Sequence, residues 1–560
     1  MRLHTPIKLA ICLLSGVLAL AAFQTSDSDK EKAKDNNKAS MEGKISHAIT
    51  GEPVKKVSVI LSGHGKNTTA ETDDKGAFSF DNLEPGRYTL MAQKNGFAPG
   101  AYGARGNSMA GTPLNLSAGQ QMKGLNWKLL PNAVITGKVL DADGEPIQNA
   151  MVMPMIAAYD KGKKLWAPAG QGMTNDQGEY RVANLKAGKY VVMASNLVNN
   201  LTGSMTGTSA RPAEDKPEPA YITTYYPSVA EQESASPVEV GVGGEVGRID
   251  IHLVKVDSFR VKGRWDNAPT QGKMTLMVLT PKGAGILGML SANRAQLNAD
   301  GSFEFRGVPP GEYMLSATQD FLSPMGAQMP VQVKDRHISG VIMQTVAPID
   351  LSGSLVVEGK GSDKIALKQL GARLNPVDFL LLNPPKATAD ESGKFTFRGV
   401  TPARYEVRTD NGSAQLYIKS VKYGDHEVDD DGIDLSAGAQ GPVEITLSTE
   451  GAEVKGTVTG EDGNAMAGVT VVLVPDSRRI SQFHNTVSDQ KGAFDFTNLP
   501  PGDYKLLAWE ELEPNQFQDP EFLAKYIAKA ETVRLMANDK KSFTLPAIPA
   551  AVTEHFLIEG

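Results

Sequence analysis

Cysteine is nearly absent from this sequence. The 560 residues include one cysteine, Cys12, which lies in an apolar segment near the N-terminus. The rest of the chain therefore cannot form a disulfide, a thiol redox centre or a thiolate metal site. Cys12 is also a poor candidate for lipid attachment, because few apolar residues precede it and Ile11 stands where a small residue is expected.

Long apolar runs are equally scarce, and the clearest one covers residues 9–23. Arg2 and Lys8 precede it, and an Ala-Leu-Ala sequence near its end fits the cleavage rule, so we predict a signal peptide over 1–21. The run is short for a membrane span, although an uncleaved anchor is the alternative. A polar tether over 22–41 follows. We expect an exported protein that is periplasmic, cell-surface or secreted, with no transmembrane span after signal cleavage.

The motifs of common enzymes are missing. The eight histidines are scattered, none belongs to an H-E-x-x-H zinc motif, and there is no G-x-S-x-G elbow or phosphate loop. We therefore expect no catalytic residues, no metal and no cofactor. Two acidic segments, "DADG" (141–144) and "DDDG" (429–432), are explained by hairpin turns; the alternative, a calcium site, would need six or more oxygen ligands. The net charge of -7 argues against a nucleic-acid partner.

One sequence motif, in contrast, occurs five times, and we call it the repeated phrase. Its copies are "GAFSFDNLEPGRYTL" (76–90), "GEYRVANLKAGKYVV" (178–192), "GSFEFRGVPPGEYML" (301–315), "GKFTFRGVTPARYEV" (393–407) and "GAFDFTNLPPGDYKL" (492–506). The copies recur about every 100 residues, which is the length of a β-sandwich domain and far longer than a solenoid repeat. The spacing predicts one sandwich for each copy.

Each position of the phrase has a structural interpretation. We expect its first glycine to adopt a positive φ, its alternating apolar residues to enter a core, and its tyrosine to form a tyrosine corner. An aromatic binding platform is the alternative for the tyrosines. An aspartate shortly before each glycine is predicted to make the preceding turn; these residues are Asp74, Asp176, Asp300, Asp390 and Asp489.

The repeats predict an all-β protein, a tandem array of five β-sandwich domains. The expected boundaries are 42–130, 131–256, 257–347, 348–450 and 451–560. The second domain contains a long loop over 196–237, which is rich in proline and acidic residues. The fifth contains a helical insertion near 519–536, because apolar residues fall at helical spacing after Asp519-Pro520.

Aromatic residues make up only 6% of the chain, and most fall at core positions of the predicted strands. A sugar-binding surface would need exposed aromatic rings with polar partners beside them. Candidate binding residues outside the repeated phrase are Trp166, Tyr225, Tyr226 and Trp509. Local packing within their loops is the alternative explanation for all of them.

The phrase and its upstream hairpin, seen in 135–153 and 454–473, resemble carboxypeptidase regulatory-like domains. The resemblance covers about residues 42–548 and implies transthyretin-like (Ig-like) sandwiches, related to the B-type repeats of collagen adhesins, in an exported bacterial protein. It implies no peptidase activity, because the zinc-binding residues of such an enzyme are missing here. The lysine–asparagine crosslinks of the adhesin repeats are not expected, since Glu510 alone stands at the required acidic position.

We therefore expect a non-catalytic binding or adhesion protein of the bacterial envelope. Its partner would be an extracellular polysaccharide or an envelope protein. The alternatives are a structural spacer and an accessory subunit to a peptidase or a polysaccharide-uptake system. The unequal loops favour binding, because a spacer could be built from uniform units.

Overall fold

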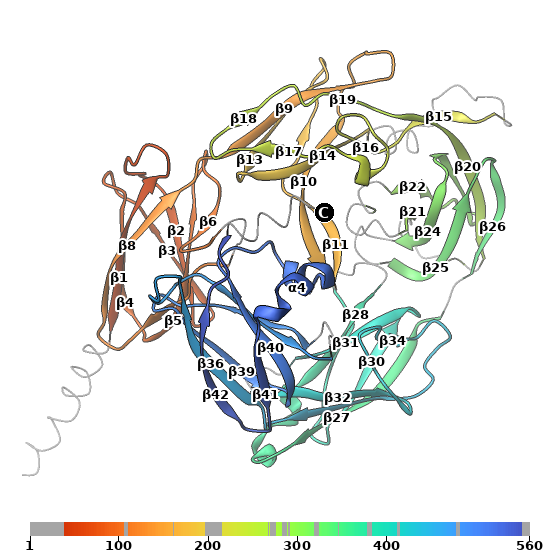
Figure 1. Ribbon diagram of the computed structural model, residues 1–560. Coiled ribbons are helices and arrows are strands. Elements are labelled where there is room, and N and C mark those ends of the chain that lie inside the picture. Colours follow the sequence, from red (N-terminus) through yellow and green to blue (C-terminus); the bar gives the residue numbers. More distant parts are fainter. Residues whose placement is uncertain are drawn as a thin grey trace, which may run out of the picture. The chain divides into compact units, whose positions relative to one another are not determined.

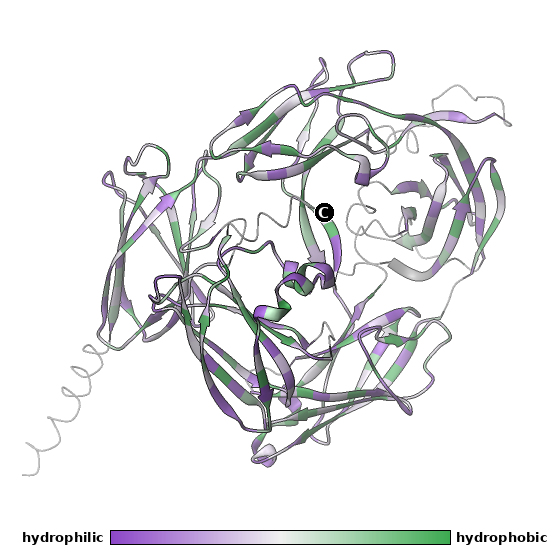
Figure 2. Cartoon of the chain, viewed as in Figure 1, coloured by the Kyte–Doolittle hydropathy of each residue, from purple (hydrophilic) through white to green (hydrophobic). Residues whose placement is uncertain are grey.

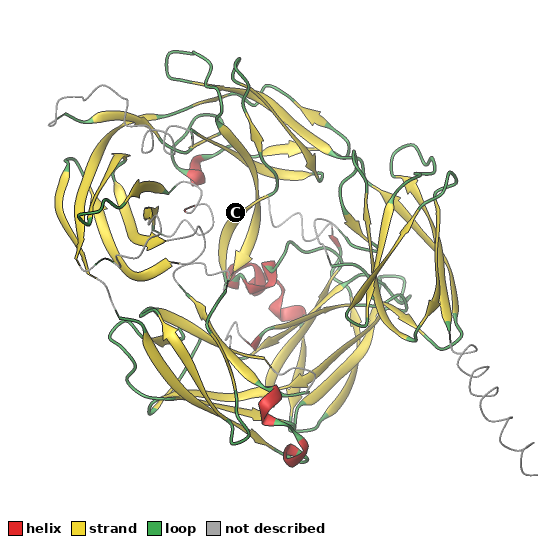
Figure 3. Cartoon of the chain, turned by 180° about the vertical axis from the view of Figure 1, so that it is seen from behind, coloured by secondary structure: helices red, strands yellow, loops and turns green. Residues whose placement is uncertain are grey.

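The structure is a computed structural model that describes residues 38–550 except for short gaps. The gaps are 106–109, 161, 197–215, 267, 269–275, 283–287, 289–291, 319–323, 345–346, 378–382, 411–414 and 478–481. The predicted signal peptide and most of the predicted tether lie outside the described residues. In the described chain the regular secondary structure consists almost entirely of strands, which loops and a few short helices connect (Figures 1 and 3). The expected all-β fold class is confirmed.

We call the five predicted segments the first to fifth repeats. The first contains β1 (Ala39–His47), β2 (Ser58–Gly63), β3 (Lys66–Glu71), β4 (Ala77–Leu83), β5 (Gly86–Gln93), β6 (Gly100–Ala101), β7 (Leu114–Leu116) and β8 (Gln121–Leu129). The second contains β9 (Ala133–Leu140), β10 (Met151–Asp160), β11 (Lys163–Pro168), β12 (Gly172–Met173), β13 (Glu179–Leu185), β14 (Gly188–Ser195), β15 (Glu218–Tyr221), β16 (Thr224–Tyr225), η1 (Gln232–Ser234), β17 (Val238–Val240), β18 (Glu245–Val246) and β19 (Ile251–His252).

The later repeats follow the same plan. The third contains β20 (Lys255–Asp266), β21 (Leu276–Pro281), β22 (Asn293–Gln296), β23 (Ser302–Val308), β24 (Gly311–Thr318), β25 (Pro324–Val333) and β26 (Ile338–Gln344). The fourth contains β27 (Ile349–Glu358), η2 (Ser362–Lys364), η3 (Leu367–Gln369), β28 (Gly371–Pro376), β29 (Lys386–Thr388), β30 (Lys394–Val400), β31 (Arg404–Asp410), β32 (Tyr417–Tyr423), β33 (His426–Glu427), β34 (Ile433–Asp434) and β35 (Val443–Ser448). The fifth contains β36 (Ala452–Thr459), β37 (Thr470–Pro475), β38 (His484–Val487), β39 (Ala493–Leu499), β40 (Gly502–Trp509), η5 (Gln516–Gln518), α4 (Pro520–Tyr526), η6 (Ile527–Lys529), β41 (Glu531–Leu535) and β42 (Lys540–Pro546).

Two sheets form each repeat. One sheet joins the first strand of the repeat to the strand of the repeated phrase and to the closing strand, as in the order β4-β1-β8. The phrase strand is antiparallel to the first strand, whereas the closing strand is parallel to it. The second sheet contains the strand that begins inside the phrase and carries its tyrosine, as in β3-β2-β5-β6. Hydrophobic and hydrophilic residues alternate along many of these strands (Figure 2), as expected when one face covers a core.

By their contacts the residues separate into two compact units. One unit contains the first repeat to Pro131 together with residues 466–468 and 487–492, and the other contains the rest of the chain. In the first repeat, β1 begins at Ala39, inside the segment predicted as the tether, because Ala39 and Met41 are buried in the core. The boundaries of the five sandwich domains remain a prediction.

The repeated phrase has a structural role in each repeat. Its first glycine has a positive φ in every copy, between 70° and 81°, as predicted. Its alternating apolar residues are buried, as in the Phe303–Phe305 pair, whose rings meet edge to face. Every tyrosine hydroxyl donates a hydrogen bond to the carbonyl oxygen four residues earlier, at 2.6–2.9 Å. The tyrosine corner is therefore confirmed in all five copies.

The turn before the phrase differs in detail from the prediction. In the first two repeats the side chain that accepts backbone hydrogen bonds is that of Asp73 or Asn175, and not that of Asp74 or Asp176. Asp73 Oδ1 accepts from the amides of Lys75 and Ala77, both at 2.8 Å, and these bonds lower the pKa of Asp73. The acceptor must stand three residues before the glycine to reach both amides, so the adjacent aspartate cannot replace it.

One position of the phrase carries a feature that the sequence analysis did not assign. This position is always asparagine or glycine and always has a positive φ, between 57° and 65°; the residues are Asn82, Asn184, Gly307, Gly399 and Asn498. At this point the phrase strand contains one residue more than its partner strand, which defines a β-bulge. The sequence signal for this bulge was that only asparagine and glycine occur at the position. These are the residues that best tolerate the left-handed region of backbone conformation.

The tyrosine corner gives a first prediction. Tyr504 is buried, and its hydroxyl donates to the Pro500 carbonyl at 2.7 Å. Tyr504→Phe should lower the local free energy of unfolding by about 1–2 kcal/mol, because it leaves that carbonyl without its partner. Amide hydrogen exchange of β39 and β40 in the full chain measures this loss. Tyr313→Phe should reduce the protection of β23 and β24 by a similar amount, and unchanged exchange in both variants would contradict a stabilising corner.

The helical insertion is shorter than predicted. α4 begins after Asp519, whose side chain accepts hydrogen bonds from the amides of Glu521 and Phe522. It ends at Tyr526, and after the short helix η6 the residues 531–535 form strand β41, which pairs with β40. The helical spacing of apolar residues is confined to the first part of 519–536. Pairing with the edge of β40 determines the structure of the rest.

Candidate functional site

The second repeat has two apolar faces on one sheet. β10 and β14 are neighbours in the sheet β11-β10-β14-β16 (Figure 1). Side chains on opposite faces of a strand alternate, so Val152, Val192 and Ala194 cover the sandwich core. Met153 and Met193, which are paired in register, point to the opposite face. This outer face is therefore apolar as well, which a sandwich with one core does not require.

We call the apolar layer on the outer face the methionine layer. Its buried residues are Met151, Met153, Met155, Val191 and Met193, and Trp166, Tyr225 and Ala235 pack against it. The structure thus brings together two of the predicted binding residues, Trp166 from β11 and Tyr225 from β16. Methionine is unbranched and polarizable, so it packs adaptably beneath aromatic rings. The unbroken apolar run "MVMPM" at the start of β10 was the sequence signal for two buried faces.

Trp166 lies at the edge of this layer. β11 is the terminal strand of the sheet in the described part of the chain, and Trp166 is half-buried on it. The Lys164 ammonium lies 5.4 Å from the centre of the indole ring. Met173 pairs with Met151 in the ladder and is 53% exposed, and Leu165 is 38% exposed. Leu165 is opposite Ala158 and points to the other face of the sheet, so we call Lys164, Trp166 and Met173 the β11 rim.

The two tyrosines occupy different faces. Tyr225 packs on the methionine layer, and burial, followed by the charges of Glu233 and Glu231, raises the pKa of its hydroxyl. Tyr226 packs against the sandwich core instead, and its amide donates to the carbonyl of Val192 at 2.9 Å. The two rings therefore do not form one platform. Tyr225 packs against the methionine layer, whereas the backbone of Tyr226 is bonded to β14.

Trp509 is fully buried, so the prediction that it is exposed was wrong. It lies on β40 and packs with Leu507 of β40 and Val472 of β37, on the opposite face from the inward-pointing Leu506 and Ala508. The insertion between β40 and β41 folds back over this face and covers it with the rings of Phe517, Phe522 and Tyr526. Trp509 is a core residue of that cluster. Its position at the end of a strand, just before a loop, gave no indication of this cover.

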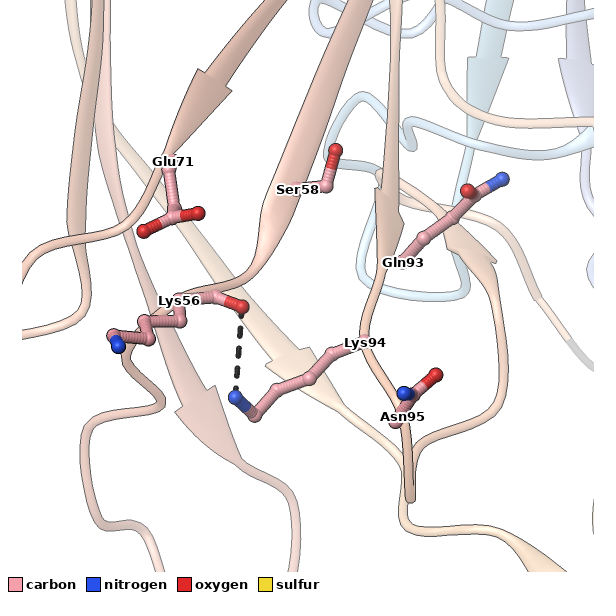
Figure 4. Close-up of a pocket in the computed structure, with 6 residues that line it drawn as sticks. All are labelled: Lys56, Ser58, Glu71, Gln93, Lys94 and Asn95. Atoms are coloured by element: carbon pink, nitrogen blue, oxygen red, sulfur yellow. Dashed lines mark hydrogen bonds between the residues drawn. The ribbon is translucent and has the colours of Figure 1, made fainter.

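A polar pocket lies in the first repeat (Figure 4). It has a volume of about 350 Å³ and is lined by Lys56, Ser58, Glu71, Gln93, Lys94 and Asn95. Lys94 Nζ donates to the carbonyl oxygens of Lys55 at 2.7 Å and Lys56 at 3.5 Å. Backbone carbonyls thus hold the lysine ammonium in place. The pocket offers polar contacts without an aromatic face.

A second cavity, of about 560 Å³, lies in the fourth repeat. It is found where η2 and η3 connect β27 to β28, in place of the hairpin seen in other repeats. Its lining combines apolar side chains, such as Leu355 and Leu367, with charged ones, such as Asp363 and Glu391. Such a mixed lining does not define one class of ligand.

The acidic turns use their carboxylates for the backbone. Asp141 Oδ1 accepts hydrogen bonds from the amides of Asp143 and Glu145, both at 2.9 Å. Asp429 accepts in the same way from Asp431. Throughout the described ranges there is no group of three or more histidine, cysteine, aspartate or glutamate side chains that could hold a metal ion. Within the same ranges no helix is long and apolar enough to cross a membrane.

Residues 40–128 and 453–514 match the profile of the carboxypeptidase regulatory-like domain. Two segments of the chain thus match this domain family. The matched segments lie in the first and fifth repeats, and both contain the repeated phrase. The other carboxypeptidase regulatory-like candidates, the second to fourth repeats, share with them the parallel closing strand, the bulge and the tyrosine corner. The sequence resemblance is confirmed.

Known proteins align with the chain at low identity. Colossin-A of Dictyostelium discoideum is 21% identical over 496 residues, which is 79% of this chain but 4% of that protein's length. The TIE protein of Bacillus anthracis is 14% identical, with a TM-score of 0.17, over 55% of this chain and 51% of that one. Two B repeat units of the collagen binding protein of Staphylococcus aureus are 12% identical, with a TM-score of 0.14, over 73% and 99%. The chain thus spans only a small part of Colossin-A and about half of the TIE structure.

Proposed function

We propose that this chain is a non-catalytic, exported adhesion protein that binds an extracellular or envelope protein through the β11 rim. The observation that carries the proposal is the second apolar face of the β10–β14 sheet, which ends in exposed side chains at the edge of the sheet. A spacer needs one core in each sandwich. An additional aromatic and apolar edge is typical of a surface that contacts a partner.

The chemistry of the rim favours a protein over a polysaccharide. A pyranose ring stacks on an open aromatic face, but the Lys164 ammonium lies over the Trp166 ring at 5.4 Å. The exposed side chain of Met173, on the same face of the sheet as Trp166, is apolar and offers no hydrogen bonds to sugar hydroxyls. Tryptophan and methionine are enriched in the centres of protein interfaces. An edge strand can in addition pair with an extended segment of a partner.

Capture from envelope and extracellular protein fractions tests the proposal. The full chain should retain a partner, and the double variant Trp166→Ala/Met173→Ser should retain at least about ten-fold less, because tryptophan anchors often carry the largest share of binding energy. Met536→Ser is the matched control, since Met536 is 67% exposed on another repeat. Equal capture by all three proteins would exclude the rim. Binding on a glycan array, lost in the same double variant, would favour the polysaccharide, and no capture at all would favour the spacer.

A further inference from the structure

A short segment of the predicted loop 196–237 belongs to two sheets at once. β15 pairs antiparallel with β20, so that Glu218 is opposite Ser258 and Tyr221 is opposite Lys255. β16, which follows after Ile222 and Thr223, pairs with β14. The first of these sheets belongs to the third repeat and the second to the second repeat (Figure 1). The prediction that 196–237 is only a loop was therefore wrong for residues 218–225.

Glu218 is the strongest contact of this segment with the third repeat. Its carboxylate accepts hydrogen bonds from the Arg260 guanidinium, including one from Nε at 3.1 Å. Arg260 is 5% exposed, so this ion pair is largely shielded from water. Ser258 Oγ donates to the Glu218 carbonyl oxygen at 2.6 Å. Removing one partner of such a buried ion pair is costly in free energy, because the other charge then remains buried without a partner.

The same segment binds the chain that links the two repeats. Only Leu253 and Val254 lie between β19 and β20. The Ile222 amide donates to the Val254 carbonyl at 3.0 Å, and the Val254 amide donates to Thr224 Oγ1 at 2.9 Å. Thr224 is fully buried, and its hydroxyl donates in turn to the Ile222 carbonyl at 3.0 Å. Both backbone polar groups of Val254 are therefore satisfied by this segment.

A third set of contacts reaches the first hairpin of the second repeat. The Tyr221 hydroxyl lies 3.4 Å from Asp141 Oδ2, within hydrogen-bond distance. The Lys255 ammonium lies 5.9 Å from the centre of the Tyr221 ring. Burial, followed by the charge of Asp141, raises the pKa of Tyr221. Tyr221 thus connects the start of β20 to a turn of the preceding repeat.

We infer that residues 218–225 form a splint that holds the second and third repeats as one rigid body. Domains joined by a short linker normally move relative to one another unless a substantial interface restrains them. Here the restraint is a shared strand segment, a shielded ion pair and a linker whose polar groups are bonded to the splint. A consequence is that a force applied to the second repeat, for example through a bound partner, is transmitted to the third repeat without bending of the chain at residues 253–254.

Distance measurements between spin labels test the splint. Cys12 is the only cysteine of the chain, so Lys189→Cys and Gln332→Cys in a Cys12→Ser background provide unique attachment sites on exposed positions of the two repeats. The parent protein should give a narrow distance distribution. Glu218→Ala and the isosteric Thr224→Val should each broaden it, and the combination should broaden it at least roughly two-fold, as expected for domains released from a restraint.

Matched controls keep the outcome unambiguous. Glu312→Gln removes one carboxylate of an exposed ion pair with Lys282 in the third repeat, and it should leave the distribution unchanged. Hydrogen exchange of β10 and β23 in the same samples shows whether both sheets remain folded. A broad distribution in the parent, or an equally narrow one in the folded double variant, would overturn the splint.

Discussion

Gly137→Ala should unfold the second repeat or lower its free energy of unfolding by about 3 kcal/mol or more. Gly137 lies on β9, and a Cβ atom built there would stand 2.2 Å from the carbonyl oxygen and 2.5 Å from the carbonyl carbon of Ile249. These are backbone atoms beside the parallel strands β18 and β19, and they cannot rotate away as a side chain does. Insertion of atoms into a well-packed region typically costs about 1–3 kcal/mol, and occasionally more.

Hydrogen exchange of β9 and β13 in the full chain measures this effect. Gly241→Ala is the matched control in the same repeat, because a Cβ at Gly241 meets no atom within 4 Å. Exchange should be greatly accelerated in Gly137→Ala and nearly unchanged in Gly241→Ala. Equal protection in the two variants would mean that β9 and the closing segment are not packed as closely as the structure indicates. Gly43 and Gly456 make the same close approach to the closing strands of the first and fifth repeats.

Trp509→Ala should destabilise the fifth repeat by about 3–5 kcal/mol, the usual cost of deleting a large buried ring. Trp509 contacts the rings of Phe522 and Tyr526, with centroids 6.1 Å and 5.8 Å away. Its loss would remove the support of the insertion that includes α4. Protection of β40 and α4 should therefore fall together in hydrogen exchange.

Two further variants separate packing from other roles of Trp509. Its Nε1 is buried without a hydrogen-bond partner in the described part of the chain, so Trp509→Phe should cost much less than Trp509→Ala. Trp166→Ala, at a half-exposed position, should also cost much less. Stability unchanged by Trp509→Ala, with altered ligand capture, would restore Trp509 as a binding residue.

The repeated phrase was predictable because its physics is local. A glycine with positive φ, alternating apolar residues and a tyrosine that bonds four residues back all act within fifteen residues of chain, and all five copies repeat them. The turn acceptor was misplaced by one residue in the first repeat because Asp73 and Asp74 are adjacent and chemically alike. Only the geometry of the turn distinguishes them.

The candidate site was less predictable because it depends on contacts between distant segments. Trp166 and Tyr225 are far apart in sequence, and the methionine layer that unites them is formed by strand register. Trp509 precedes a loop, yet that loop returns to cover it. The pairing of Glu218 with Arg260 could not be foreseen either, since a proline- and acid-rich segment is more often a simple loop.

The central claim is that binding occurs at the unrepeated β11 rim and not at the repeated phrase. Amide hydrogen exchange of the full chain, with and without a captured partner protein, tests it most directly. We expect new protection at residues 163–168 and 172–173, with little change at β4, β13, β23, β30 and β39, the first strand of each copy of the phrase. Protection confined to the phrase strands, with none at β11, would contradict the account.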